Sequence, residues 1–318
     1  MTNISIKNAF NRMWQHVHNL SGETLSTAKN YTDQRIEDVS NSIVAASNAA
    51  AHNAIYRGKN LTNIYTIDEI CERITNGTFE DLYIGDYFNI TFTNPNGYEE
   101  TMTCVFAAFD YYYRETESLG GSYMLPQHSA LIVPKNCLHN EYAINLKENY
   151  TTYACEGGFI GTTAFQTTLP AYAESLKEVF GDHLRQHKNM FTKEINAEGA
   201  SSAGAGMIGY ASGWSERSVY LSLLSEVQVL GSQVWSSSPL NVGMDSGQLP
   251  LFALDKSAKL AYLQDEPSYV GIDWWLRDIA SAHSFCMIGG NGRAVSKSAT
   301  NQIGLRPIFL IGNPDVEM

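Results

Sequence analysis

Two short patterns in the sequence have spacings that occur in cofactor and metal sites. Residues 204–209 match GxGxxG, which binds a dinucleotide when a buried strand precedes it and a helix follows. A polar stretch precedes it here, so a surface loop is expected. His183 and His187 lie four residues apart in a segment predicted to be helical, where two histidines can share a metal. Because "HLRQH" has no glutamate between them and no third ligand is evident, a solvated helix face is favoured.

A nucleophile or an acid–base pair is equally hard to place. Ser212 and Ser215 fall outside the GxSxG spacing of a hydrolase nucleophile. Glu99 and Glu100 stand beside a predicted hairpin, and the sequence assigns them no acid and base roles. We therefore expect no catalytic residues, no metal and no cofactor, and hence a protein that is not an enzyme. A cell-wall or glycan hydrolase is the enzymatic alternative.

Two arginines stand inside apolar runs near the end of the chain. Arg277 lies in "DWWLRD" and Arg306 in "GLRPIF". An unpaired buried charge is very costly, so each guanidinium requires a carboxylate or carbonyl partner. A structural ion pair is the favoured interpretation, and a grip on an anionic ligand is the alternative.

Composition excludes several classes of partner. The 318 residues carry 21 Lys+Arg against 33 Asp+Glu, a formal charge of -12, without a basic stripe that could neutralise phosphates. The N-terminus has no signal-peptide pattern, and no apolar run has the length of a membrane span. Nucleic-acid binding and membrane insertion are therefore not expected, and synthesis in the cytoplasm is. Five widely spaced cysteines without a CxxC pair predict free, buried thiols.

The first 57 residues are predicted to be helical and to form an anchor or stalk. Residues 20–57 contain no proline, and heptad positions repeat through Leu25, Thr32, Val39, Ala46 and Asn53 on one seam. Lys29, Ile36, Ile43 and Ala50 form the other, and both are weak. An earlier stripe contains Phe10, Met13, Trp14 and Val17. The candidate anchoring or oligomerisation residues are Phe10, Trp14, Leu25, Ile36, Val39 and Ile43. An ordinary surface helix packed on its own domain is the alternative.

The remaining residues are predicted to form an α+β head with parts 58–160 and 161–318. A short helix begins at the capping box of Thr66 and Glu69, and "NPNG" at 94–97 marks a hairpin. A helix over 168–191 is capped by Thr168, and Ser225 and Gln228 form a second capping box. The segment 303–312 is expected to be one final strand. Hairpins and separate helices without regular strand–helix alternation favour α+β.

Four motifs in this head carry a resemblance. "VYLSLLSEVQVLG", "LPLF", "DWWLRD" and "GLRPIF" resemble an uncharacterised domain of structural proteins from phages and prophages of Gram-positive gut bacteria, over residues 60 to 312. The closing motifs are similar to those of the C-type-lectin-like fold of the formylglycine-generating-enzyme type. Leu305 departs from the usual valine or phenylalanine, and the catalytic cysteines of those enzymes have no counterpart here. The resemblance implies a scaffold of Trp275, Leu276, Arg277, Gly304, Leu305, Arg306 and Pro307 around a displayed loop over 278–302.

The resemblance implies a function in a virus particle. It predicts an oligomeric, trimeric fibre or spike on the exterior of the virion, attached to other virion proteins through its N-terminus. The lectin-like head would bind a glycan or protein of the host surface. The candidate contact residues are Ile279, His283, Asn291, Arg293, Lys297 and Asn301. The alternative is a capsid-decorating head-fibre or assembly protein without a receptor-binding role.

Overall fold

The computed structural model describes residues 3–46, 48–112, 128–198, 209–236, 247–263 and 271–312. The chain divides into two compact units, Met1–Ser47 and Asn48–Met318, here called the N-terminal helix unit and the body. No helix in these ranges is long and apolar enough to cross a membrane. The boundary between these two units lies between Ser47 and Asn48, earlier in the chain than the predicted boundary at residue 57.

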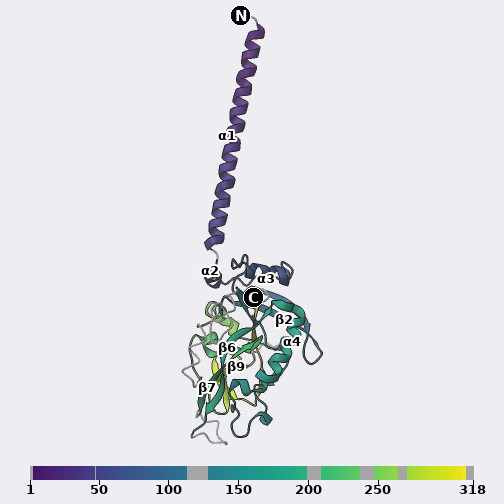
Figure 1. The fold of residues 1–318 in the computed structure, drawn as a ribbon, viewed down its shortest axis with the longest axis vertical. Coiled ribbons are helices and arrows are strands. Elements are labelled where there is room, and N and C mark those ends of the chain that lie inside the picture. The colour runs from purple at the N-terminus through teal and green to yellow at the C-terminus, as the bar shows by residue number, and fades with distance from the viewer. Residues whose placement is uncertain are drawn as a thin grey trace. The chain divides into compact units, whose positions relative to one another are not determined.

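The N-terminal unit is one continuous helix, α1 (Asn3–Ala46) (Figure 1). It passes through Gly22, and the hydroxyls of Thr24 and Thr27 donate to the carbonyls of Leu20 and Glu23 at 2.8 Å. The helix predicted over 20–57 was too long, because a new helix, α2 (Ala49–Asn53), follows the N-cap residue Asn48. The side chain of Asn48 accepts hydrogen bonds from the first backbone N–H groups of α2, as an N-cap does.

Helix α2 belongs to the body. His52 is buried, and its Nδ1 lies 2.5 Å from the carbonyl oxygen of Leu82. The amide of Asn53 donates to the carbonyl of Phe109 at 2.9 Å and accepts from its N–H at 2.8 Å. Ala50 and Asn53, predicted as heptad positions of the long helix, thus lie in a separate element.

The larger sheet of the body is antiparallel. Its path is β1 (Tyr87–Thr93), β2 (Glu99–Phe109), β3 (Ser129–Pro134), β13 (Pro307–Gly312) and β5 (Leu184–Arg185), and β8 (Leu221–Leu223) also pairs with β13. Strands β1 and β2 form the predicted hairpin around 94–97. Every residue of β3 and β13 is buried, so these central strands carry the core.

A second sheet of five strands contains most of the predicted display loop. Its order is β11 (Ala294–Ser298), β10 (Ser284–Ile288), β9 (Trp274–Ile279), β12 (Gln302–Gly304) and β4 (Glu141–Ala143). The predicted final strand over 303–312 is divided at Leu305 and Arg306, where the chain passes from β12 in this sheet to β13 in the larger one. Gly304 pairs in parallel with Trp274, so "DWWLRD" and the start of "GLRPIF" are neighbours. Strands β6 (His187–Asn196) and β7 (Tyr210–Val219) form a third, two-stranded sheet.

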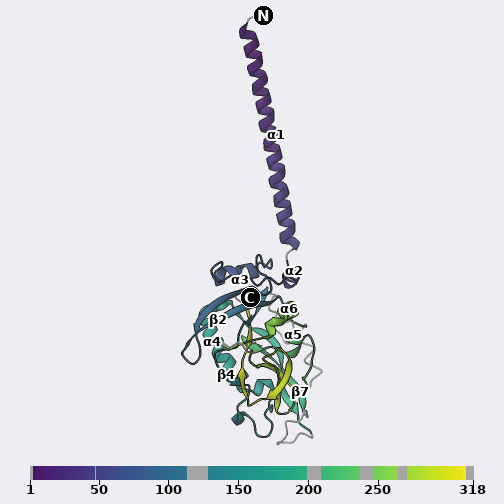
Figure 2. The same ribbon diagram turned by 180° about the vertical axis from the view of Figure 1, so that it is seen from behind.

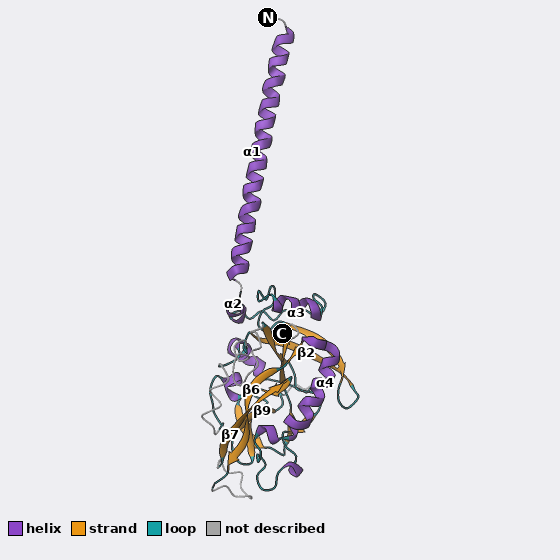
Figure 3. Cartoon of the chain, in the orientation of Figure 1, coloured by secondary structure: helices purple, strands orange, loops and turns teal. Residues whose placement is uncertain are grey.

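The helices of the body are short. Both predicted capping boxes are confirmed, at the starts of α3 (Ile67–Thr75) and α5 (Glu226–Leu230). Helix α4 (Leu169–Phe180) runs alongside the strands (Figure 3) and ends at Gly181, where φ is +53°, so the helix predicted over 168–191 was too long. A π-helical turn (Ala164–Thr168) leads into α4, and the side chain of Thr168 does not cap it.

The remaining elements complete an α+β fold. Helix α6 (Pro250–Leu254) lies beside α5 (Figure 2), where the N–H of Leu249 donates to the carbonyl of Gln228 at 2.9 Å. Short 3₁₀ turns span Lys147–Asn149, Phe159–Gly161, Gly181–His183 and Lys256–Lys259. One continuous apolar cluster runs through both larger sheets and includes the fully buried Trp274 and Trp275. All five cysteines are free and buried, as predicted.

Candidate functional site

The predicted contact residues of the segment 278–302 do not form one cluster. Ile279 is fully buried in β9, so its proposed role in ligand contact was wrong: β9 is covered on both faces. Asn291 and Arg293 are exposed at the turn between β10 and β11. His283 and Asn301 lie at the other end of these strands, about 17 Å away for five residues at 3.3 Å each. Lys297 is half-buried in β11, and its Nζ pairs with Asp273 at 3.0 Å.

The two sequence patterns considered and disfavoured as metal or nucleotide sites can now be compared with the structure. His183 and His187 do not share a helix face, because the first lies in a 3₁₀ turn and the second in β6. Within the described ranges no three histidine, cysteine, aspartate or glutamate side chains are grouped to hold a metal. The GxGxxG pattern lies almost wholly outside the described residues. Of the anchor candidates, Phe10, Trp14 and Leu25 are exposed on α1, whereas the side chains of Ile36, Val39 and Ile43 are outside the described part.

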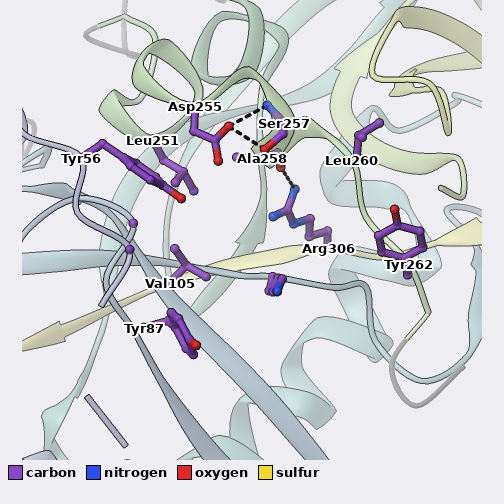
Figure 4. Close-up of a pocket in the computed structure, with 13 residues that line it drawn as sticks. Tyr56, Tyr87, Val105, Leu251, Asp255, Ser257, Ala258, Leu260, Tyr262 and Arg306 are labelled. Carbon is purple, nitrogen blue, oxygen red and sulfur yellow. Dashed lines mark hydrogen bonds between the residues drawn. The ribbon is translucent and has the colours of Figure 1, made fainter. Parts of the chain in front are cut away.

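A pocket of about 290 Å³ opens elsewhere on the body (Figure 4). Its walls come from the segment after α2, the β1–β2 hairpin, and the stretch from α6 through the 3₁₀ turn Lys256–Lys259. Apolar side chains, among them Val105 and Leu251, form part of the lining. The polar and aromatic lining residues include Tyr56, Tyr87, Lys135, Asp255, Tyr262 and Arg306.

An ion cluster holds the segment that carries Tyr56. Arg57 donates to Asp86 from Nε at 3.0 Å and from a terminal nitrogen at 2.6 Å, and it also pairs with Asp81. Lys59 binds the same two carboxylates, through its N–H to Asp86 at 2.8 Å and through Nζ to Asp81 at 2.9 Å. Asp86 is fully buried. The cluster therefore fixes the chain on both sides of Gly58, at the rim of the pocket.

Tyr56 and Asp255 extend toward each other across the pocket (Figure 4). Asp255 accepts the N–H of Ser257 at 2.8 Å and its hydroxyl at 2.6 Å. Burial, together with the charge of Asp255, raises the pKa of Tyr56. Burial opposes ionisation of Asp255, but hydrogen bonds from Ser257 and Tyr56 outweigh it and lower the pKa of this carboxyl. The pocket thus presents an ionised carboxylate beside a neutral phenol at neutral pH.

Arg306 lines the same pocket while being only 1% exposed. Its Nε donates to the carbonyl of Pro134 and a terminal nitrogen to that of Ala258, both at 2.7 Å. The guanidinium also lies 5.2 Å from the ring of Trp274. Burial lowers the pKa of Arg306 to about 10, partly opposed by Cys137. The predicted carbonyl partners are confirmed, but the favoured ion pair is not: no carboxylate among the described residues pairs with Arg306.

Arg277 lies away from this pocket, in β9. It is buried, its N–H donates to the carbonyl of Leu224 at 2.9 Å, and its guanidinium lies 5.4 Å from the ring of Phe191. The two arginines of the closing motifs therefore occupy different environments, and only Arg306 lines the pocket.

Gly85 lets the ring of Tyr56 lie against the backbone. Its φ is +81°, and an added Cβ would stand 2.2 Å from Cε2 of Tyr56. We expect Gly85→Ala to lower the free energy of unfolding by about 3 kcal/mol, from left-handed strain and this clash. Gly97→Ala is the matched control, because Gly97 has φ +84° with open space around it, and about 1 kcal/mol is expected there. Urea unfolding measures both, and equal losses would show that Tyr56 does not press on Gly85.

Comparison with known families reaches the C-terminal part of the body. A family model described as a domain of unknown function (DUF6273) matches residues 176–313, less than half of the chain. Comparison with curated proteins and with solved structures gave no match. The matched span contains the four motifs of the closing segment, from "LLSE" to "GLRPIF". The C-terminal part of the body is therefore similar to a domain of unknown function, and the similarity includes Asp255 and Arg306 of the pocket but not Tyr56 or Lys135.

Proposed function

We propose that the chain is a bacteriophage virion protein of the fibre or spike type, not an enzyme. In this proposal the N-terminal helix unit anchors a trimer to the particle, and the body is a lectin-like head that binds a host-surface glycan or protein. The observation that carries the proposal is the exposed apolar face of α1. The pocket and the exposed turn at Asn291 and Arg293 are two candidate ligand sites on the described part of the body.

The apolar side chains of α1 gather on one side of the helix. Phe10 is 59% exposed, Trp14 56% and Leu25 74%, and Met13, Val17, Leu20 and Tyr31 are exposed as well. At 100° per residue these seven positions fall within an arc of about 140°. Arg12 and Glu23 lie on the opposite side. Ser21, Thr24 and Arg35 fall within the same arc, so polar side chains interrupt the face. Exposed large apolar side chains gathered on one side of a helix are nevertheless typical of an interaction surface.

Association would stabilise such a helix considerably. Burying each large apolar side chain contributes about 1.5–3 kcal/mol, whereas an isolated helix draws little stability from its own propensities. Packing against copies of the same helix, or against another virion protein, would bury these apolar side chains. Either contact would serve the anchoring role that we propose for this unit.

The test is the double variant Phe10→Ser/Trp14→Ser. We expect the wild-type chain to sediment as an oligomer, and the variant to dissociate at protein concentrations at least tenfold higher, because two large side chains no longer contribute to the interface. Arg12→Ser/Glu23→Ser, on the opposite side of the helix, is the control and should sediment as the wild type does. A monomeric wild-type protein, or a variant with unchanged mass, would contradict self-association through this face.

Particles assembled with the same double variant distinguish the proposed function from the alternative. Loss of the protein from the particle, together with loss of adsorption to host cells, supports an attachment role. Particles that lose the protein and become fragile, yet still adsorb, identify a capsid-decorating role instead.

A further inference from the structure

The pocket contains more positive than negative charge, although the chain as a whole is acidic. Arg306 and Lys135 line it together with one carboxylate, Asp255, in a protein of formal charge -12. Lys135 is exposed, and no carboxylate among the described residues pairs with it. Asp255 is already bonded to Ser257 at 2.6 and 2.8 Å. Among the described lining residues, no second carboxylate balances these two cations.

Of the two cations, Arg306 is the stronger evidence for an anionic ligand. An arginine has five N–H donors in a planar fork, and the two bonds to Pro134 and Ala258 involve only Nε and one terminal nitrogen. Both acceptors are neutral carbonyls, so they satisfy donors without cancelling the charge. A buried guanidinium is costly unless an anion compensates it. A carboxylate is the anion whose planar geometry suits the arginine fork best among small organic acids.

The size and walls of the pocket narrow the ligand further. A volume of about 290 Å³ is at the small end of ligand pockets and suits a single ring. Tyr56, Tyr87 and Tyr262 provide aromatic surface, and Val105 and Leu251 provide aliphatic surface. Asp255 and the hydroxyl of Tyr56 offer hydrogen-bond partners for hydroxyl groups. A six-membered sugar ring that carries one carboxylate combines these features.

We propose that the pocket between Tyr56, Asp255 and Arg306 binds a hexuronate, with the carboxylate facing Arg306 and Lys135 and the ring hydroxyls facing Asp255. This deepens the proposed function, on which it rests for the origin of the ligand in an acidic surface glycan. The charge and size of the pocket do not depend on that origin.

The experiment is a titration of the purified full-length chain with small sugars, in which binding is measured by calorimetry and by ligand-observed NMR. The probes are D-glucuronate and D-galacturonate, with D-glucose and D-galactose as neutral counterparts of the same ring size. We expect millimolar binding of at least one uronate, and roughly tenfold weaker binding of its neutral counterpart, since charge-assisted hydrogen bonds are lost. Equal affinity for both, or no uronate binding into the tens of millimolar, would overturn the proposal. Equal affinity for acetate or inorganic phosphate would overturn the sugar-acid class.

Variants locate the binding. Lys135→Gln removes an exposed charge at the pocket and should weaken uronate binding about fivefold to tenfold, whereas Lys147→Gln, an exposed lysine outside the lining, should not. If both variants bind the uronate as tightly as the wild type does, the ligand binds elsewhere. Arg306→Met is less informative alone because the buried side chain supports the fold.

The two proposals fail separately. Uronate binding by the purified chain, without any effect of Lys135→Gln on particle adsorption, would contradict attachment through this pocket but not the pocket's ligand. Adsorption that depends on the protein, without uronate binding, would contradict the ligand but not the attachment role.

Discussion

Replacing Glu226 by alanine is expected to lower the free energy of unfolding of the body by about 3 kcal/mol. Glu226 is fully buried at the start of α5. Its carboxylate accepts the backbone N–H groups of Val234 and Trp235 at 3.0 Å and of Ser236 at 2.7 Å. Each donor that loses its acceptor costs about 1–3 kcal/mol, and water reaching the partly exposed loop reduces the sum.

The measurement is urea unfolding, with two further variants for comparison. Glu226→Gln retains one acceptor oxygen but directs an amide at backbone donors, so an intermediate loss of about 2 kcal/mol is expected. Glu72→Ala removes an exposed glutamate of α3 and should change stability by less than about 0.5 kcal/mol. A loss below about 1 kcal/mol for Glu226→Ala would mean that the loop 234–236 does not depend on this carboxylate.

The capping box next to Glu226 shows which features are legible in the sequence. Ser225 and Gln228 contact each other within one turn, so their pattern alone identifies the helix start. The role of Glu226 was not predicted because its donors lie eight to ten residues later in an irregular loop. Hydrogen bonds between close neighbours leave a pattern in the sequence, whereas the longer-range hydrogen bonds of Glu226 leave none.

The error in the helix over 168–191 has a similar cause. Its apolar spacing continued through Leu184, which is indeed buried. The chain nevertheless turns at Gly181 and forms β5, because Leu184 and Arg185 pair with Ile311 and Leu310 of β13 at the far end of the chain. Tertiary pairing therefore overrode a helical pattern that was locally consistent.

The candidate site was only partly visible. Arg306 stood out as a charge inside an apolar strand, and its carbonyl partners follow from the cost of burying it. Asp255 and Ser257 form an ordinary turn motif, and Tyr56 was included in the long helix. No sequence pattern connects these residues, because Tyr56, Asp255 and Arg306 are distant in the sequence and meet only in the folded body. Ile279 was misplaced because a strand buried on both faces gives no alternation to read.

The second large effect is loss of stability in acid through His187. This histidine is 1% exposed in β6, stacks on Tyr112 with 5.0 Å between ring centres, and has Nε2 at 3.3 Å from the hydroxyl of Ser222. Burial, and secondly the charge of Arg277, lowers the pKa of His187 to about 3. In the unfolded chain the pKa is about 6.5. The neutral form is therefore strongly preferred in the folded body.

The sign of the pH dependence follows from proton binding. Between about pH 6.5 and pH 3 the unfolded chain binds a proton at His187 and the folded chain does not, so stability falls as the pH falls. One proton corresponds to about 1.4 kcal/mol per pH unit, or roughly 3 kcal/mol between pH 7 and pH 4.5. His187→Phe keeps the stacked ring and removes the titrating group, so its unfolding free energy should fall by that much less over this range, after an initial loss of about 1 kcal/mol from the contact with Ser222. The exposed His16 of α1 provides the control, because His16→Phe should leave the slope of the wild type unchanged. Parallel curves for wild type and His187→Phe would show that His187 takes up its proton without unfolding the body.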